Sequence, residues 1–111
     1  MTSTSDLKPF TFPKQPAEKE IIGVDFSRRI PSGVTIASYT VVSDLFGNTA
    51  DQIANMTGTP LSVSAVSVVK KTLSCLISDG ENGYHYRVTF TITLSDGQIK
   101  QDEVFVDVKE D

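Results

Sequence analysis

The C-terminal third of the chain alternates between apolar and polar residues. One face of this pattern holds Tyr84, Tyr86, Val88, Phe90, Ile92 and Leu94, and the other holds His85, Arg87, Thr89, Thr91 and Thr93. Because successive side chains of a β-strand point to opposite faces of its sheet, this period of two predicts a strand and leaves little room for a helix. An Asp-Gly turn follows at residues 95–98, so the pattern predicts a hairpin.

The return strand of this hairpin carries an aromatic residue on its polar face. The predicted register places Val104, Val106 and Val108 inward, and Glu103, Phe105 and Asp107 outward. Phe105 is therefore a candidate partner contact. The alternative interpretation is a singly exposed aromatic residue without a role.

Earlier parts of the chain show the same behaviour between turn signals. The predicted strands are residues 20–26, 34–43, 61–69 and 71–78. The alternation of the third of these changes phase at Val66, where a β-bulge would restore it. Residues 44–60 indicate a loop with room for a helical turn across residues 50–56.

Strands with one apolar face need a second sheet to cover that face. About six or seven such strands predict an all-β fold, an immunoglobulin-like antiparallel β-sandwich, over residues 20–111. Residues 1–19 are predicted to be an extended N-terminal arm, because three prolines there fix φ and remove backbone donors. Phe10 and Phe12 lie in this arm, and exposure of their aromatic side chains to water would give no stabilisation. They either pack back on the domain or dock on a neighbouring subunit.

Composition and charge narrow the classes of function. The chain of 111 residues is 39% hydrophobic and 22% charged, which excludes wholesale disorder and suits one domain. A single cysteine, Cys75, suits a fold made in the cytoplasm or a particle assembled there. The sequence has no run of 18 apolar residues, so no membrane span is predicted. The first residues lack the pattern of a secretory signal.

The net charge of −4 is unevenly spread along the chain. Residues 1–78 hold seven bases and six acids, a balance of +1, and residues 79–111 hold three bases and eight acids, a balance of −5. Without a basic stripe, nucleic-acid binding is not expected. A molecule with one acidic side and one near-neutral side could stack on copies of itself or on a basic partner. A solvated acidic sheet face is the plainer interpretation.

Candidate chemistry is sparse. His85 is the only histidine and is predicted to face outward, whereas Cys75 is predicted to face inward beside Leu73 and Ile77, so a Cys–His nucleophile pair is not expected. Residues 79–83 offer oxygen ligands next to glycines, but a calcium loop would need glutamate at its twelfth position, which is Phe90. We expect no catalytic residue, cofactor or metal site, and no enzyme.

Two stretches resemble a known family when taken together. Residues 13–38 contain Lys14-Gln-Pro16, then Asp25-Phe26-Ser27, then Ile36-Ala37-Ser38, and residues 78–98 contain a glycine-bearing loop, an aromatic residue opening a strand, and a Ser-Asp-Gly turn. This combination is similar to phage fiber-tail adaptor proteins of tailed phages and prophages. Phe26 stands where tryptophan is common in that family, and the segment of residues 44–60 is longer.

The resemblance implies a non-enzymatic virion structural protein with an immunoglobulin-like fold. Such a protein would sit in the neck or tail as a homo-oligomeric ring assembled in the host bacterial cytoplasm, and would link connector, tail or fibre proteins. Phe10, Phe12 and Phe105 are the candidate partner-binding residues. The alternative function is an immunoglobulin-like module that binds carbohydrate or a cell surface through exposed aromatic residues such as Phe105 and Tyr39.

Overall fold

The computed structural model describes residues 11–55 and 60–110. Within them the chain forms seven strands, one α-helix and one turn of 3-10 helix. In chain order the elements are β1 (Thr11–Lys14), β2 (Glu20–Asp25), η2 (Ser27–Arg29), β3 (Ile36–Leu45), α1 (Ala50–Ala54), β4 (Leu61–Val69), β5 (Thr72–Asp79), β6 (His85–Leu94) and β7 (Ile99–Val108).

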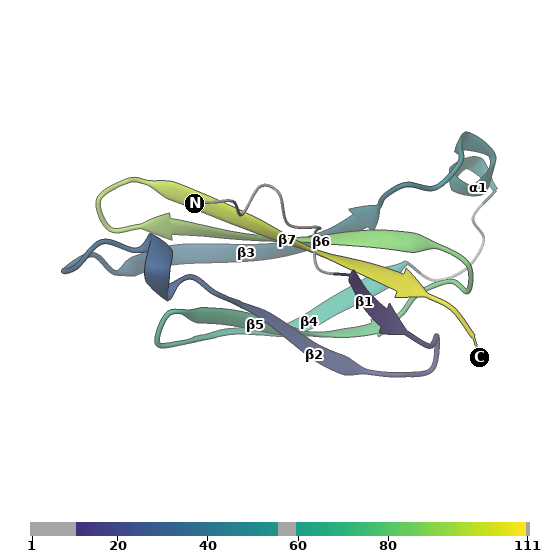
Figure 1. The fold of residues 1–111 in the computed structure, drawn as a ribbon, viewed down its shortest axis with the longest axis horizontal. Helices are drawn as coiled ribbons and strands as arrows, with labels where there is room; N and C mark the ends of the chain where they lie inside the picture. Colours follow the sequence, from purple (N-terminus) through teal and green to yellow (C-terminus); the bar gives the residue numbers. More distant parts are fainter. Residues whose placement is uncertain (1–10, 56–59, 111) are drawn as a thin grey trace.

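The strands form two sheets that lie face to face (Figure 1). One sheet has four strands in the order β1-β7-β6-β3, and the other has three in the order β2-β5-β4. Neighbouring strands are antiparallel except β1, which runs parallel to β7. The predicted all-β sandwich is therefore confirmed.

The core lies between the sheets and follows the alternation of the sequence. Each inward residue predicted from Tyr86 to Leu94 is buried, as are Val104, Val106 and Val108 of the return strand. Cys75 is buried with Leu73 and Ile77, as predicted. Phe26, directly after β2, is also fully buried, so the aromatic residue of the Asp-Phe-Ser motif is a core residue.

Two irregular features predicted from the sequence are present. The pairing of β4 with β5 shifts register between Ser64 and Ser67, and Ala65 adopts a φ of 51°, which confirms the bulge. A short helix, α1, occupies the predicted helical turn, and Thr49 and Gln52 form a capping box at its start.

Strand boundaries differ from the prediction by one or two residues in β2, β3, β5 and β6. β3 begins at Ile36 and continues to Leu45, since Asp44 and Leu45 still pair with β6. Tyr84 precedes β6 and is half-buried, and its hydroxyl donates to the Gln52 carbonyl oxygen at 3.1 Å. The residue thus connects the start of β6 to α1.

The segment from Thr11 onward is an edge strand of the sandwich. Thr11 to Lys14 pair with Phe105 to Val108 of β7. Lys14 is only 2% exposed, and its Nζ donates to the carbonyl oxygens of Gln15, Pro16 and Asp79 at 2.8, 3.1 and 2.6 Å. These contacts satisfy the buried ammonium group and fix the end of β1 to the end of β5.

Candidate interaction surface

The outer face of the four-stranded sheet brings together charged and aromatic side chains from three strands. In the ladder, Phe105 of β7 lies opposite Arg87 of β6, and Arg87 lies opposite Asp44 of β3. Phe46 comes two residues after Asp44 and stays next to β6, because its backbone N–H donates to the His85 carbonyl oxygen at 2.9 Å. Together, Asp44, Phe46, Arg87 and Phe105 are called the aromatic–arginine cluster below.

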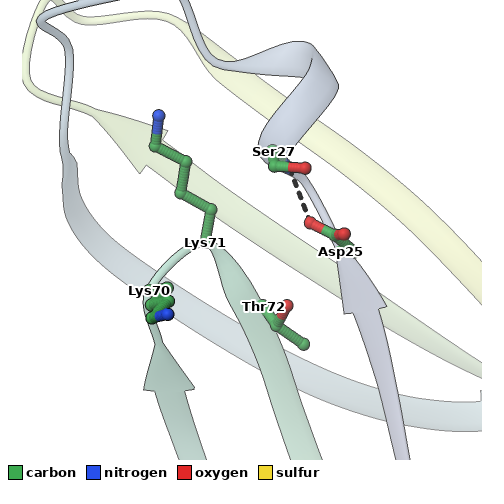
Figure 2. Close-up of a pocket in the computed structure, with 5 residues that line it drawn as sticks. All are labelled: Asp25, Ser27, Lys70, Lys71 and Thr72. Carbon is green, nitrogen blue, oxygen red and sulfur yellow. Dashed lines mark hydrogen bonds between the residues drawn. The ribbon is translucent and has the colours of Figure 1, made fainter.

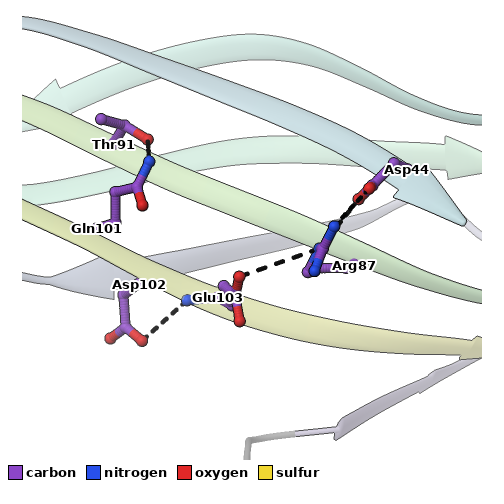
Figure 3. A network of polar contacts seen from close by, with 6 residues as sticks. All are labelled: Asp44, Arg87, Thr91, Gln101, Asp102 and Glu103. Carbon is purple, nitrogen blue, oxygen red and sulfur yellow. Dashed lines mark hydrogen bonds and ion pairs between the residues drawn. The ribbon is translucent and has the colours of Figure 1, made fainter. Parts of the chain in front are cut away.

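Arg87 is held in place by carboxylates on both neighbouring strands (Figure 3). Its Nη2 donates to Asp44 Oδ2 at 2.7 Å and its Nε to Asp44 Oδ1 at 3.2 Å, while Glu103 Oε2 lies 4.0 Å from Nε. The hydrogen bonds to Asp44, with the charge of that residue, raise the pKa of Arg87 above its ordinary value. A two-point contact of this kind fixes the plane of the guanidinium group.

The two phenylalanines of the cluster pack on each other and on that guanidinium group. The ring centroids of Phe46 and Phe105 are 4.7 Å apart with an interplanar angle of 48°, and Arg87 Cζ lies 5.2 Å from the Phe46 centroid. These distances are typical of aromatic pairs and cation–π contacts. Phe46 nevertheless remains 42% exposed. The two rings of the cluster therefore form an ordered apolar patch on a polar sheet face.

This arrangement corrects the interpretation of Phe105 as a singly exposed residue. Phe105 is half-buried, because Phe46 covers part of its ring. Phe46 was missed from the sequence, since the strand before it was predicted to end at residue 43. The signal was present in the alternation of Val42, Asp44 and Phe46, which continues the outer face of β3.

The aromatic residues of the arm lie elsewhere. Phe10 is outside the described residues. Phe12 belongs to β1 and packs against the buried core, whereas its neighbour Thr11 is in register with Phe105. Since successive residues of a strand point to opposite faces, Phe12 and Phe105 lie on opposite faces of the sheet. The structure does not bring them together.

A shallow pocket of about 440 Å³ lies at the β4–β5 turn. Figure 2 shows Lys70, Lys71 and Thr72 on one side, and Asp25 and Ser27 across from them. The Ser27 backbone N–H donates to Asp25 Oδ1 at 2.9 Å, and this bond lowers the pKa of Asp25. The carboxylate is thus engaged in stabilising its own turn.

The reactive residue types are separated. Burial raises the pKa of the Cys75 thiol to about 11, so the thiol stays protonated near neutral pH. His85 Nδ1 lies 2.7 Å from Asp107 Oδ1 on the outer sheet face. In residues 11–55 and 60–110, no three His, Cys, Asp or Glu side chains are grouped so as to hold a metal ion. The same residues include no helix with the length and apolar character needed to cross a membrane.

Comparison with known proteins gives one family. A family model described as "Podophage GP4 fiber-tail adaptor protein gp77" matches residues 14–107, which is well over half of the chain. The match includes all the strands from β2 to β6, and nearly all of β7. No curated protein sequence matches the chain.

Proposed function

The chain belongs to the podophage fiber-tail adaptor family, and on this basis we propose that it is a non-enzymatic structural adaptor in the neck or tail of a phage particle. It links connector or tail proteins to one another or to fibres. It is assembled into the particle in the host bacterial cytoplasm, as a homo-oligomeric ring. Binding to nucleic acid or to a membrane has no part in this role.

The proposed immunoglobulin-like character of the fold draws support from strand order. If β2 to β7 are lettered B to G, the two sheets are B-E-D and C-F-G, the order found in immunoglobulin constant domains. β1 departs from that scheme, because it joins β7 and not β2. Folds of this class serve many functions, so the role has to be argued from the surface.

The aromatic–arginine cluster is the observation that carries the adaptor role. Interface residues that contribute most to binding are enriched in aromatic side chains and arginine, and they are surrounded by polar residues. Phe46 and Phe105 provide an apolar patch already held in position by Arg87, so little conformational entropy is lost when a partner covers it. A partner virion protein with an apolar side chain fits this patch.

Alanine substitutions test this assignment. Phe46→Ala and Phe105→Ala are expected to reduce incorporation of the chain into phage particles at least tenfold, measured by quantitative mass spectrometry of purified particles. Thr93→Ala, on the same sheet face but outside the cluster, is the matched control and should incorporate normally. Wild-type incorporation of both phenylalanine variants, with their folding unchanged, would refute the role of the cluster.

The N-terminal arm is proposed to dock on an adjacent subunit or on the connector through Phe10. Phe12 is the weaker part of this proposal, because it packs against the core of its own domain. The test should delete residues 1–10 and leave β1 intact, since a longer deletion would remove the buried Lys14 and its three hydrogen bonds. We expect the shortened chain to fold with an unchanged melting temperature but to incorporate poorly. Normal incorporation would rule the arm out.

The alternative carbohydrate-binding function draws less support. Tyr39 is in register with the inward-facing Ile92, so Tyr39 and Phe105 do not form a common stacking platform. A glycan array in which binding is abolished by Phe105→Ala would favour that alternative.

A further inference from the structure

The loops between the strands gather at the two ends of the sandwich, along its longest dimension of 46 Å (Figure 1). At one end, the backbone N–H of Phe26 donates to the Lys71 carbonyl oxygen and that of Ser95 to the Thr35 carbonyl oxygen, each at 2.8 Å. The loops of this end are residues 26–35, 70–71 and 95–98. The described loops of the opposite end are residues 15–19, 46–55, 80–84 and 109–110.

The two ends carry opposite charge. The loops of the first, called the basic end below, hold four bases and one acid: Arg28, Arg29, Lys70, Lys71 and Asp96. The described loops of the second, called the acidic end, hold four acids and two bases: Glu18, Asp51, Glu81, Glu110, Lys19 and Lys109. Salt screens charges beyond about 8 Å. The charges of one end therefore do not neutralise those of the other.

The lysines of the basic end are open to a partner. Lys70 and Lys71 line the shallow pocket at the β4–β5 turn (Figure 2), and neither forms an ion pair within the described part of the chain. The carboxylates nearby are engaged in their own turns, since Asp25 Oδ1 accepts from the Ser27 N–H at 2.9 Å and Asp96 Oδ1 from the Gln98 N–H at 3.1 Å. The basic end therefore attracts carboxylates of another molecule.

Each end also exposes apolar side chains beside its charges. At the basic end, Val69 directly precedes Lys70 and is 66% exposed, and Ile99, the first residue of β7, is 63% exposed. At the acidic end, Ile53 of α1 is 53% exposed. Protein interfaces combine an apolar centre with a polar rim. Both ends have the side chains for such a contact.

We propose that the basic end of one copy docks on the acidic end of the next copy, head to tail. This inference rests on the proposed ring and specifies the contact that joins its neighbouring copies. A second copy presents the surface whose charge complements the basic end, and ends of the same sign would repel each other. The net charge of −4 also opposes approach in orientations that do not pair opposite charges. The contact is heterologous, which is the kind that generates a ring when its rotation closes.

Charge reversal at the basic end is the first test. Arg28→Glu, Lys70→Glu and Lys71→Glu together give its loops a net negative charge, so this end repels the acidic end of the next copy. We expect incorporation into phage particles, measured by quantitative mass spectrometry, to fall about tenfold or more. Lys19→Glu with Lys109→Glu is the control: it also replaces bases by glutamate, but at the acidic end, where complementarity is kept. The control should incorporate normally, and melting temperatures establish that each variant folds.

Reversal at both ends of one chain distinguishes a second copy from other partners. Asp51→Lys, Glu81→Lys and Glu110→Lys together leave the chain with two basic ends, and incorporation should again fall about tenfold. Combined with the basic-end variant, these changes restore complementarity with the signs exchanged, and we expect incorporation within about threefold of the wild type. A loss at the basic end that the combined variant does not restore would overturn the inference and indicate a different acidic partner, DNA included. Normal incorporation of both single-end variants would overturn it as well.

Zero-length cross-linking of wild-type particles is an independent measurement that needs no variant to fold. A carbodiimide joins a lysine amine to a carboxylate in contact with it. We expect multimers larger than dimers, with peptides that link Lys70 or Lys71 to Glu18, Glu81 or Glu110. Such links form between copies, because the two ends lie at opposite extremes of the molecule.

Two cross-linking results would overturn the inference while the adaptor role stands. The first is the absence of links between basic and acidic ends. The second is a product that stops at dimers, which would indicate copies paired side by side in opposite directions. Absence of the wild-type chain from purified particles would instead refute the proposed function itself.

Discussion

Cys75 shows how one buried side chain makes the stability of the fold depend on pH. The thiol is about 1% exposed on the inner face of β5, and burial raises its pKa from 9.0 to about 11. Well below pH 9 the thiol is neutral in both the folded and the unfolded chain. Between pH 9 and 11 the unfolded chain loses the proton that the folded chain keeps, so the free energy of unfolding falls as pH rises.

The expected loss from this residue is about 2–3 kcal/mol by pH 11, at about 1.4 kcal/mol per pKa unit. Urea denaturation at several pH values from 8 to 11 should show it. Cys75→Val is the control, because it keeps an apolar side chain of similar size but cannot ionise. Burial also raises the pKa of Tyr86, which makes both chains less stable at high pH, so the difference between them isolates Cys75. Equal pH dependence of the two chains would contradict the assignment.

The burial of single residues was predictable where the alternation of the sequence decides which face of the strand they occupy. Cys75, Phe90 and Val106 were assigned inward from the period of two alone, and each is buried. The burial of Lys14 was not predicted, because it depends on a carbonyl oxygen of Asp79, which lies 65 residues farther along the chain. The position of Phe46 was not predicted, because it depends on a hydrogen bond to the backbone of His85.

The β4–β5 turn is an element whose sequence and backbone disagree. Val69 pairs with Thr72, so Lys70 and Lys71 form a two-residue loop, and Lys70 adopts a φ of 58°. This left-handed conformation costs a residue with a Cβ about 1–2 kcal/mol, whereas glycine adopts it freely. The turn is therefore a local source of instability.

Lys70→Gly is expected to raise the free energy of unfolding by about 0.5 kcal/mol. It removes the cost of the left-handed conformation, about 1–2 kcal/mol, against about 0.5–1 kcal/mol for the greater chain entropy that glycine gives the unfolded state. The lysine side chain that it deletes is exposed. Equilibrium urea denaturation measures the change. Lys71→Gly is the matched control: it alters the same loop and removes the same charge, but Lys71 does not have a positive φ. It should leave stability unchanged or lower it. If both variants gain equally, charge and not backbone strain is responsible.

At the level of elements, the sequence predicted strands that pair with their neighbour in sequence, and it predicted the bounds of the other strands less accurately. β6 and β7 were identified with their turn, because each is the nearest partner of the other in sequence. β1 was predicted only as part of an extended arm, since its pairing depends on β7, about ninety residues away, and the prolines of the arm argued against a central strand. The continuation of β3 to Leu45 likewise depends on β6.

The whole molecule has two outer faces of different character. The strands of the four-stranded sheet hold four acids and three bases, and those of the three-stranded sheet hold three acids and no base, so the charge asymmetry along the chain does not become an asymmetry between layers. What distinguishes the four-stranded sheet is that ion pairs and the aromatic–arginine cluster lie on its outer face. The outer face of β5 instead pairs small hydroxyl residues with those of β4, as in Ser74 opposite Ser67. A partner can therefore distinguish the faces by their ion-paired side chains and by their aromatic content.

A matched pair of lysine substitutions tests which face meets the partner. Thr89 on β6 lies between Val42 and Glu103, and Ser74 on β5 lies between Gly23 and Ser67, so each is a half-buried hydroxyl residue on a central strand. A long charged side chain at either place can reach solvent, and both variants should keep their stability within about 1 kcal/mol. Thr89→Lys is expected to reduce incorporation into particles at least tenfold, because it puts a flexible charge next to the aromatic–arginine cluster, which a partner must cover. Ser74→Lys should incorporate as the wild type does. The reverse result would place the contact on the three-stranded sheet, and the aromatic–arginine cluster would then be a stabilising feature of the sheet surface without a role in assembly.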